Sequence, residues 1–427
     1  MENERRVIPR RQASSLINSL KGGVVPRTGL PYITVGRKPE IEALLRDVDI
    51  AEDGGASFRF IVGKYGSGKS FLLQTIRSHV MDRGFVVVDA DLTPERRLQG
   101  TRGQGLSTYR ELLRNMSTKT RPEGGALPLI LDRWIEASNE AAARLVISDM
   151  NELVHGFDFA KVLTAYYDGS VSGDDEKKNR ALKWLRGEYQ GRAEARLELG
   201  VNAIVTDDDW YDYIKLFALF MRRAGYRGLL VLIDELVNIY KIPNAVARQY
   251  NYEKILTMYN DALQGRASYM GIIMSGTPQC VEDRRRGIYS YEALRSRLQE
   301  GRFSREGARD MLAPVIRLEP LTAEEMLVLS GKLAEIHAVL HDYEVKLTDE
   351  ELASFIKKEY ERIGADINIT PREVIRDLIE LLDILFQHPE ETFAGLLDSD
   401  EYMQNEPFST DTVSCDVLGQ NAVTVRI

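Results

Sequence analysis

The sequence is poor in cysteine and histidine and has no long apolar run. Its two cysteines, Cys280 and Cys415, cannot form a disulfide framework. Its five histidines are scattered, and no Cys/His cluster has the spacing of a zinc site. No segment approaches the roughly 18 consecutive apolar residues of a membrane-spanning helix, and the N-terminus lacks the apolar region of a secretory signal. We therefore expect a cytoplasmic protein with no membrane contact and no structural metal.

The composition is that of a soluble globular protein of two or three domains. The chain has 427 residues, of which 44% are hydrophobic and 28% charged, and a domain commonly spans about 150 residues. These values exclude disordered and collagen-like classes. The net charge of −9 argues against a nucleic-acid coat protein, although an acidic chain can still carry a local basic patch.

Short apolar runs on either side of a long helical stretch predict a parallel β-sheet. The runs are nearly continuous, as in parallel strands that are buried on both faces. The expected strands are 58–62, 85–89, 228–233, 269–274 and 314–318. Residues 92–225, between the second and third strands, show mainly helical periodicity. The fold class is therefore α/β, a parallel sheet flanked by helices with a large helical insertion.

The C-terminal part of the chain changes to helices only. Three capping boxes, each a threonine followed three residues later by glutamate, begin at Thr322, Thr348 and Thr370. They predict a three-helix bundle over 322–387. The expected organisation is an N-terminal arm (1–32), an α/β core (33–91 and 226–320), the insertion (92–225), a helical lid (321–388) and an acidic tail (389–427).

The segment from Gly63 to Ser70 fits the phosphate-binding pattern G-x-x-x-x-G-K-[ST]. Its glycines let backbone N–H groups curl toward phosphate oxygens, and the helix that follows points its positive N-terminus at the same anion. Lys69 is expected to reach the β- and γ-phosphates of ATP, and the Ser70 hydroxyl to bind Mg²⁺. The predicted nucleotide contacts are Gly63, Gly66, Ser67, Gly68, Lys69, Ser70 and Phe71. The alternative is a glycine-rich strand-to-helix turn with an exposed lysine.

Two acidic residues follow the third predicted strand. Asp234 stands at the C-terminal edge of this strand and is expected to help hold Mg²⁺, and Glu235 to orient and deprotonate the attacking water. Two acids with different roles favour hydrolysis over transfer to a substrate hydroxyl. The alternative is that both acids only solubilise the strand end. Ser275 and Thr277 end the next strand and are both candidates to sense the γ-phosphate, unless Ser-Gly-Thr-Pro is a plain turn.

An arginine-dense segment follows these strands. Its arginines are Arg284, Arg285, Arg286, Arg295, Arg297, Arg302, Arg305 and Arg309. One interpretation makes Arg295 or Arg297 an arginine finger in a neighbouring subunit's ATP site, since a guanidinium is always charged and binds phosphate in a bidentate way. A second interpretation is that the segment forms a track for nucleic-acid phosphates. A third is that it is a solvated face, because acidic residues lie between the arginines.

Arg372 lies in the first turn of the third C-terminal helix. A cation is unfavourable beside the free backbone amides of a helix N-terminus. We therefore expect Arg372 to face a phosphate, the alternative being a surface arginine.

Together these motifs resemble the AAA+ ATPase superfamily over residues 33–386. The corresponding motifs are Walker A at 63–70, Walker B at 229–235 and the sensor-1 strand at 270–277. The resemblance implies a finger role for Arg297 and a sensor-2 role for Arg372 on a helical lid. It also implies an adenine contact for the segment ahead of Walker A, at Val35, Gly36 and Arg37.

A closer resemblance is to the ATP-binding proteins of BREX phage-defence systems, the BrxD-like family. The stretches that carry it are 17–26, 33–37, 63–70, 181–188, 232–236 and 275–278. The most discriminating is Trp-Leu-Arg-Gly-Glu at 184–188, because Walker motifs are common to many ATPases. The resemblance implies a role in bacterial defence together with other proteins of the system, acting on double-stranded DNA.

The sequence supports two main hypotheses. In the first, an ATPase forms homo-oligomers and couples hydrolysis to the remodelling of DNA or a partner. In the second, a nucleotide-gated DNA- or protein-binding scaffold uses ATP as a switch with little turnover. A third interpretation, a P-loop kinase, is disfavoured by Glu235 and Arg372.

Overall fold

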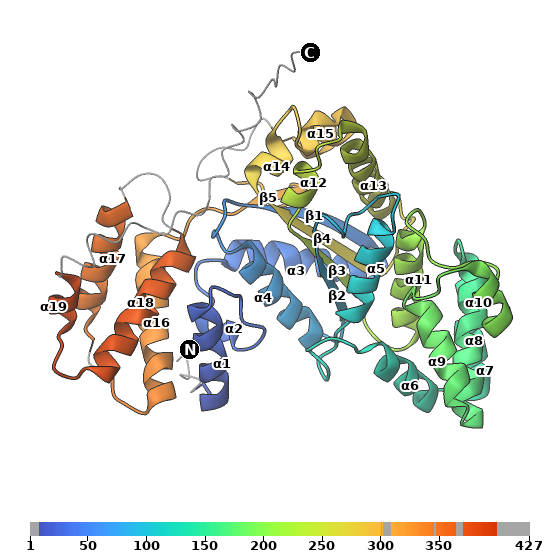
Figure 1. The fold of residues 1–427 in the computed structure, drawn as a ribbon, viewed down its shortest axis with the longest axis horizontal. Coiled ribbons are helices and arrows are strands. Elements are labelled where there is room, and N and C mark those ends of the chain that lie inside the picture. The colour runs from blue at the N-terminus through green and yellow to red at the C-terminus, as the bar shows by residue number, and fades with distance from the viewer. Residues whose placement is uncertain (1–7, 300, 302–308, 346, 364–369, 399–427) are drawn as a thin grey trace, which may run out of the picture. The chain divides into compact units, whose positions relative to one another are not determined.

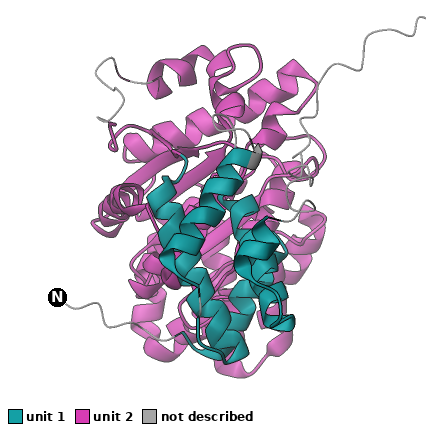
Figure 2. Cartoon of the chain, turned by 90° about the vertical axis from the view of Figure 1, so that its left-hand side faces the viewer, with its two compact units in different colours: residues 1–24, 320–427 teal, residues 25–319 magenta. Residues whose placement is uncertain are grey.

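Figure 1 shows the computed structural model, which describes residues 8–299, 301, 309–345, 347–363 and 370–398. The chain divides into two compact units. Residues 25–319 form the sheet unit, and residues 1–24 with 320–427 form the helical unit (Figure 2). Cys415, Arg302, Arg305 and most of the predicted tail lie outside the described residues. Within those ranges, no helix combines the length and apolar character needed to cross a membrane.

The sheet unit is built on five parallel strands in the order β2-β3-β4-β1-β5. The strands are β1 (Ala56–Val62), β2 (Val86–Asp91), β3 (Leu229–Asp234), β4 (Met270–Gly276) and β5 (Val315–Arg317). Each coincides with a predicted strand, which confirms the expected parallel sheet. Because β4 lies between β1 and β3, its carboxyl end stands between the phosphate loop after β1 and the acidic end of β3.

The sheet is buried on both faces, which explains the nearly continuous apolar runs. On β3, Leu230 and Leu232 belong to the hydrophobic cluster of one face, and Val231 and Ile233 to that of the other. The first face is covered by α3 (Lys38–Glu52) and α4 (Lys69–Asp82). The sheet unit also contains α2 (Leu30–Ile33), α12 (Val237–Tyr240), α13 (Ala245–Leu263), α14 (Pro278–Glu282), a 3₁₀ turn (Ile288–Ser290) and α15 (Glu292–Leu298).

The predicted insertion, residues 92–225, consists of helices as expected. They are α5 (Gln104–Arg114), α6 (Leu127–Ala137), α7 (Glu140–Asp149), a 3₁₀ turn (Met150–Glu152), α8 (Gly156–Ser172), α9 (Asp175–Leu185), α10 (Arg192–Leu199) and α11 (Trp210–Arg223). Their buried side chains, among them Trp134, Trp184 and Trp210, join the hydrophobic cluster of the second sheet face. These helices therefore share a core with the sheet and belong to the same compact unit.

The helical unit combines the two ends of the chain. Its helices are α1 (Arg10–Lys21), α16 (Ala323–His341), α17 (Asp349–Ile363), α18 (Pro371–Gln387) and α19 (Phe393–Leu397). The capping boxes at Thr322 and Thr348 form both of their hydrogen bonds, and Glu373 accepts the Thr370 backbone N–H at 3.2 Å. The predicted bundle is present, and α1 packs against α16 and α18. The first part of the expected N-terminal arm thus joins this bundle.

A buried ion pair fastens α3 to β1. Arg59 donates hydrogen bonds to both carboxylate oxygens of Asp47, at 2.5 and 2.8 Å, and the two side chains are 9% and 7% exposed. We expect Asp47→Ala to lower the free energy of unfolding by about 3 kcal/mol, because a buried guanidinium loses its charge partner. Asp49→Ala, whose carboxylate pairs with Arg83 at the surface, should cost less than about 1 kcal/mol. Urea denaturation measures both, and equal losses would contradict this account.

Candidate active site

The predicted phosphate loop joins β1 to α4. Gly66 and Gly68 have φ angles of 75° and 90°, in the left-handed region that glycine adopts without strain. A Cβ atom at Gly63 would lie only 2.4 Å from Ser67 Oγ, so a larger residue there would displace the loop. Backbone conformation and close approach therefore account for the three glycines of the loop.

Lys69, the first residue of α4, folds back over the loop. Its Nζ donates hydrogen bonds to the carbonyl oxygens of Gly63 and Lys64, both at 2.9 Å. The lysine charge and the N-terminal amides of α4 thus lie at the same loop. Such an arrangement favours the binding of an anion.

The carboxylate of Asp234 joins three segments at the carboxyl edge of the sheet. Its Oδ2 accepts the hydroxyl of Ser70 from α4 at 2.7 Å. Its Oδ1 accepts the hydroxyl of Ser275 from β4 and the backbone N–H of Glu235 at 2.7 Å. The two residues predicted to hold Mg²⁺, Ser70 and Asp234, are therefore in direct contact.

These two oxygens fit a magnesium ion. Mg²⁺ prefers oxygen ligands in octahedral geometry at 2.0–2.1 Å, which places adjacent ligands about 2.9 Å apart. The 2.7 Å between Ser70 Oγ and Asp234 Oδ2 is close to that separation. The pair could therefore become adjacent ligands with little movement of either side chain.

Glu235 has a backbone conformation that is rare for a residue other than glycine. Its φ is 61°, in the left-handed region that costs roughly 1–2 kcal/mol. Two backbone hydrogen bonds hold this turn. The Glu235 N–H donates to the Asp234 carboxylate, and the Leu236 N–H donates to the Ser275 carbonyl at 3.1 Å. Strain of this kind persists where the surrounding structure fixes it, and it concentrates at functional sites. The water-orienting role of Glu235 stays a prediction.

Of the two sensor candidates, Ser275 is the one that reaches Asp234. Ser275 is fully buried and donates its hydroxyl hydrogen to that carboxylate. Thr277 caps α14, where its hydroxyl accepts the Cys280 N–H at 3.4 Å. The γ-phosphate-sensing roles of Ser275 and Thr277 both stay predictions.

A third carboxylate, which the sequence analysis did not single out, lies at the same edge. Asp91 ends β2 and pairs in register with Asp234 on β3. Solvent reaches its side chain, yet the surrounding protein desolvates it in part. This desolvation and three neighbouring carboxylates raise the pKa of Asp91 to about 6; the neighbours are Asp234, Asp89 and Glu235. The predicted second strand ends at Asp89, whereas the sequence continues with Ala90 and Asp91. The prediction therefore did not include Asp91.

Arg37, expected to contact adenine with the two residues before it, supports the phosphate loop. Its buried guanidinium donates to the Ser67 carbonyl at 3.0 Å. Glu40, which is 1% exposed, lies 3.9 Å from the guanidinium of Arg37 and 3.3 Å from that of Arg309. This contact with the loop was not predicted, and the adenine contact stays a prediction.

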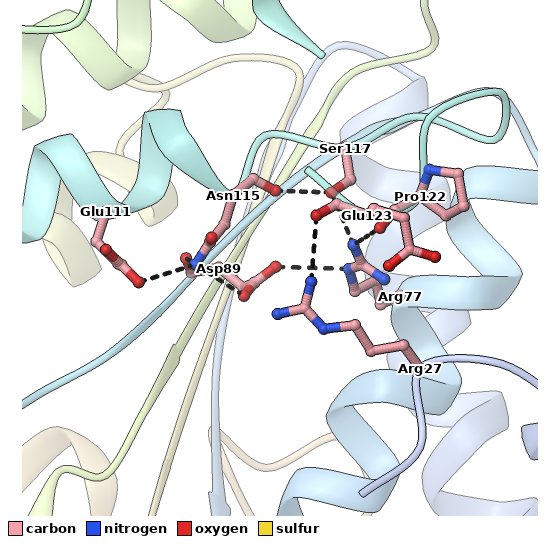
Figure 3. Close-up of polar contacts among 8 residues, drawn as sticks. All are labelled: Arg27, Arg77, Asp89, Glu111, Asn115, Ser117, Pro122 and Glu123. Atoms are coloured by element: carbon pink, nitrogen blue, oxygen red, sulfur yellow. Dashed lines mark hydrogen bonds and ion pairs between the residues drawn. The ribbon is translucent and has the colours of Figure 1, made fainter. Parts of the chain in front are cut away.

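A second buried arginine ties α4 to β2 (Figure 3). The Nη2 of Arg77 donates to the Ser117 hydroxyl at 2.7 Å and to the Pro122 carbonyl. Its Nε lies 3.5 Å from the carboxylate of Asp89 on β2. Burial lowers the pKa of Arg77 and raises that of Asp89. The cluster thus fixes the helix that follows the phosphate loop against an edge strand of the sheet.

The predicted arginine fingers lie on α15. Arg297 is exposed and donates to the Ala293 carbonyl at 2.6 Å, and the half-buried Arg295 lies 3.6 Å from Glu292. Both partners, Ala293 and Glu292, belong to α15 itself. The side chain of Arg297 is therefore at the surface of the sheet unit, accessible to another subunit. Arg372 is the second residue of α18 in the helical unit. The finger and phosphate-sensing roles stay predictions.

The chain matches a family of known proteins over most of its length. The family model described as "BREX system ATP-binding protein BrxC/D" covers residues 8–401. This range includes the phosphate loop, Asp234, Glu235 and Arg372. No curated protein matches the chain.

Asp91 should make the stability of the protein depend on pH. Its pKa rises from 3.8 to about 6 on folding, so stability falls as pH rises through that range and the full cost applies above it. Asp91→Asn should therefore raise the melting temperature at pH 7.5, by an amount that shrinks toward pH 4. The control is Asp53→Asn, at an exposed site after α3. It should change the melting temperature only slightly at either pH. A gain from Asp91→Asn that is equal at the two pH values would contradict this account.

Proposed function

Since the chain belongs to the family of BREX system ATP-binding proteins BrxC/D, we propose that it hydrolyses the ATP bound at its phosphate loop. An ATP-binding role in a defence system follows from the family itself. One observation carries the step to hydrolysis. The Asp234 carboxylate bonds the hydroxyls of Ser70 and Ser275, with a conformationally fixed Glu235 next in the chain.

Four side chains divide the tasks of hydrolysis. Lys69 and the amides at the start of α4 would bind the β- and γ-phosphate oxygens, which replace the carbonyls that Lys69 now contacts. Ser70 and Asp234 would hold Mg²⁺, which neutralises phosphate charge when bound. Glu235 would orient a water molecule and accept its proton. As the water oxygen bonds to the γ-phosphorus, the bond to the β–γ bridging oxygen breaks, and ADP and phosphate form.

We further propose that the chain acts as a homo-oligomer, in which α15 brings Arg297 or Arg295 to a neighbouring subunit's nucleotide. The exposure of Arg297 supports this. Hydrolysis would then drive the remodelling of double-stranded DNA or of other defence-system proteins. Exposed Arg284 and Arg285, directly after α14, offer positive charge for DNA phosphates.

Glu235→Gln should separate hydrolysis from binding. Loss of the general base should lower ATP turnover by about 10²- to 10⁴-fold, whereas the affinity for ATP should change only a few-fold because Lys69 and Ser70 are intact. Phosphate release and calorimetry measure the two quantities. Ser275→Ala should also lower turnover, while Thr257→Ala, at an exposed site on α13, is the control and should leave it unchanged.

Two outcomes would contradict this assignment. Glu235→Gln turning over ATP at the parent rate would exclude Glu235 as the base. Turnover that is lost while protection from phage is unchanged would favour the nucleotide-gated scaffold over an ATP-driven machine.

An arginine finger that acts in a neighbouring subunit should be detectable by mixing variants. Arg297→Ala should lower turnover by about 10³-fold, the effect of losing such a residue. Mixing it with Glu235→Gln should restore activity, because one protein supplies the arginine and the other an intact nucleotide site. The same mixture with Arg295→Ala identifies which arginine acts. Arg46→Ala, at an exposed site on α3, is the control; a mixture without recovery would contradict action between subunits.

A further inference from the structure

A cluster of two histidines and an aspartate lies in the helical unit and shares no residue with the proposed ATP site. His337 and His341 are on α16, and Asp383 is on α18. One possible ligand atom from each residue lies within 4.8 Å of the other two. We propose that this cluster binds a divalent transition metal ion of the Zn²⁺ type and thereby fastens α16 to α18.

The local geometry brings the three side chains together. Residues four positions apart on a helix share a face, and the ring centres of His337 and His341 are 4.5 Å apart. Packing of α18 against α16 adds the carboxylate of Asp383. Two imidazole nitrogens and one carboxylate oxygen form a donor set that suits Zn²⁺ and neighbouring transition metals.

The distance between two of the donors suits a shared metal ion. Tetrahedral zinc with bonds of 2.0–2.1 Å places its ligands about 3.3 Å apart. The Nε2 of His337 lies 3.1 Å from Oδ1 of Asp383, which is already close to that separation. His341, at the C-terminal end of α16 and partly exposed, can complete the site by a side-chain rotation.

Two of the ligands are also oriented by outer partners. The hydroxyl of Tyr343 lies 2.8 Å from Nδ1 of His337, so the tautomer protonated at Nδ1 can donate to Tyr343 and leave Nε2 for the metal. Lys21 on α1 holds Oδ2 of Asp383 at 2.5 Å, which leaves Oδ1 facing the histidine. Protein metal sites commonly fix their ligands through such outer hydrogen bonds.

A hydrogen-bonded core histidine would account for His337 but not for His341. The ring of His341 contacts those of His337 and Phe386, at 4.5 and 4.4 Å between centres. It makes no hydrogen bond to any other residue that the structure describes. The Lys21 ammonium opposes a bound cation, so we expect weaker binding than at structural zinc sites with four ligands.

The test is a calorimetric titration of the full chain with ZnCl₂ after treatment with EDTA. Excess Mg²⁺ is kept present to occupy the carboxylates of the active site. We expect one equivalent of Zn²⁺ to bind, and Co²⁺ in its place to give the visible absorption of a low-symmetry site. His341→Ala should weaken binding at least about 10-fold. His388→Ala is the matched control, because His388 is an exposed histidine 3.3 Å from Glu390; it should bind like the parent.

A thermal measurement keeps the test decisive if a variant folds poorly. Zn²⁺ should raise the melting temperature of the parent, since a ligand of the folded state stabilises it, and His341→Ala should lose this shift while retaining its helical circular dichroism. No Zn²⁺ binding by the folded parent, or full affinity in His341→Ala, would overturn the proposal. ATP binding uses none of these residues, so that result would leave the proposed function untouched.

Discussion

The three hydrogen bonds accepted by the Asp234 carboxylate are the constraint on which the candidate active site depends. They join α4, the end of β3 and the end of β4, although Ser70 and Asp234 are 164 positions apart in the chain. The strand order makes this possible, because β4 stands between β1 and β3 and carries Ser275 to the same edge. Loss of the carboxylate would leave two hydroxyls and one backbone N–H without their acceptor, and buried polar groups in that state are costly.

The same arrangement concentrates negative charge. Asp91, Asp234 and Glu235 share the edge of the sheet, and desolvation together with these neighbours raises the pKa of Asp91 to about 6. The left-handed φ of Glu235 adds backbone strain. A folded protein retains such features where the surrounding structure imposes them. Here the edge is suited to a cation, and the amides and Lys69 next to it are suited to an anion.

Features set by neighbouring residues could be predicted from the sequence, and those set by distant ones could not. The strands, the phosphate loop and the capping boxes depend on local patterns, and the structure has them where they were expected. The contact of Lys21 with Asp383 spans 362 positions. The four-residue spacing of His337 and His341 is visible in the sequence, but neither the packing of α1 nor the approach of Asp383 to the two histidines could be read from it. The family resemblance assigned Arg37 to a contact with the adenine base. Its hydrogen bond to the Ser67 carbonyl is visible only in the folded structure.

Two segments of the chain connect the units, one before and one after the sheet unit. Residues near each connection contact the phosphate loop or the strand before it. At residue 25 the chain enters the sheet unit and reaches Arg37, which bonds the Ser67 carbonyl. It leaves after β5, where the Leu318 N–H donates to the Val62 carbonyl at 2.7 Å and the Leu318 side chain lies beside Gly63. Residues of both connecting segments therefore contact the phosphate loop or the strand that leads into it.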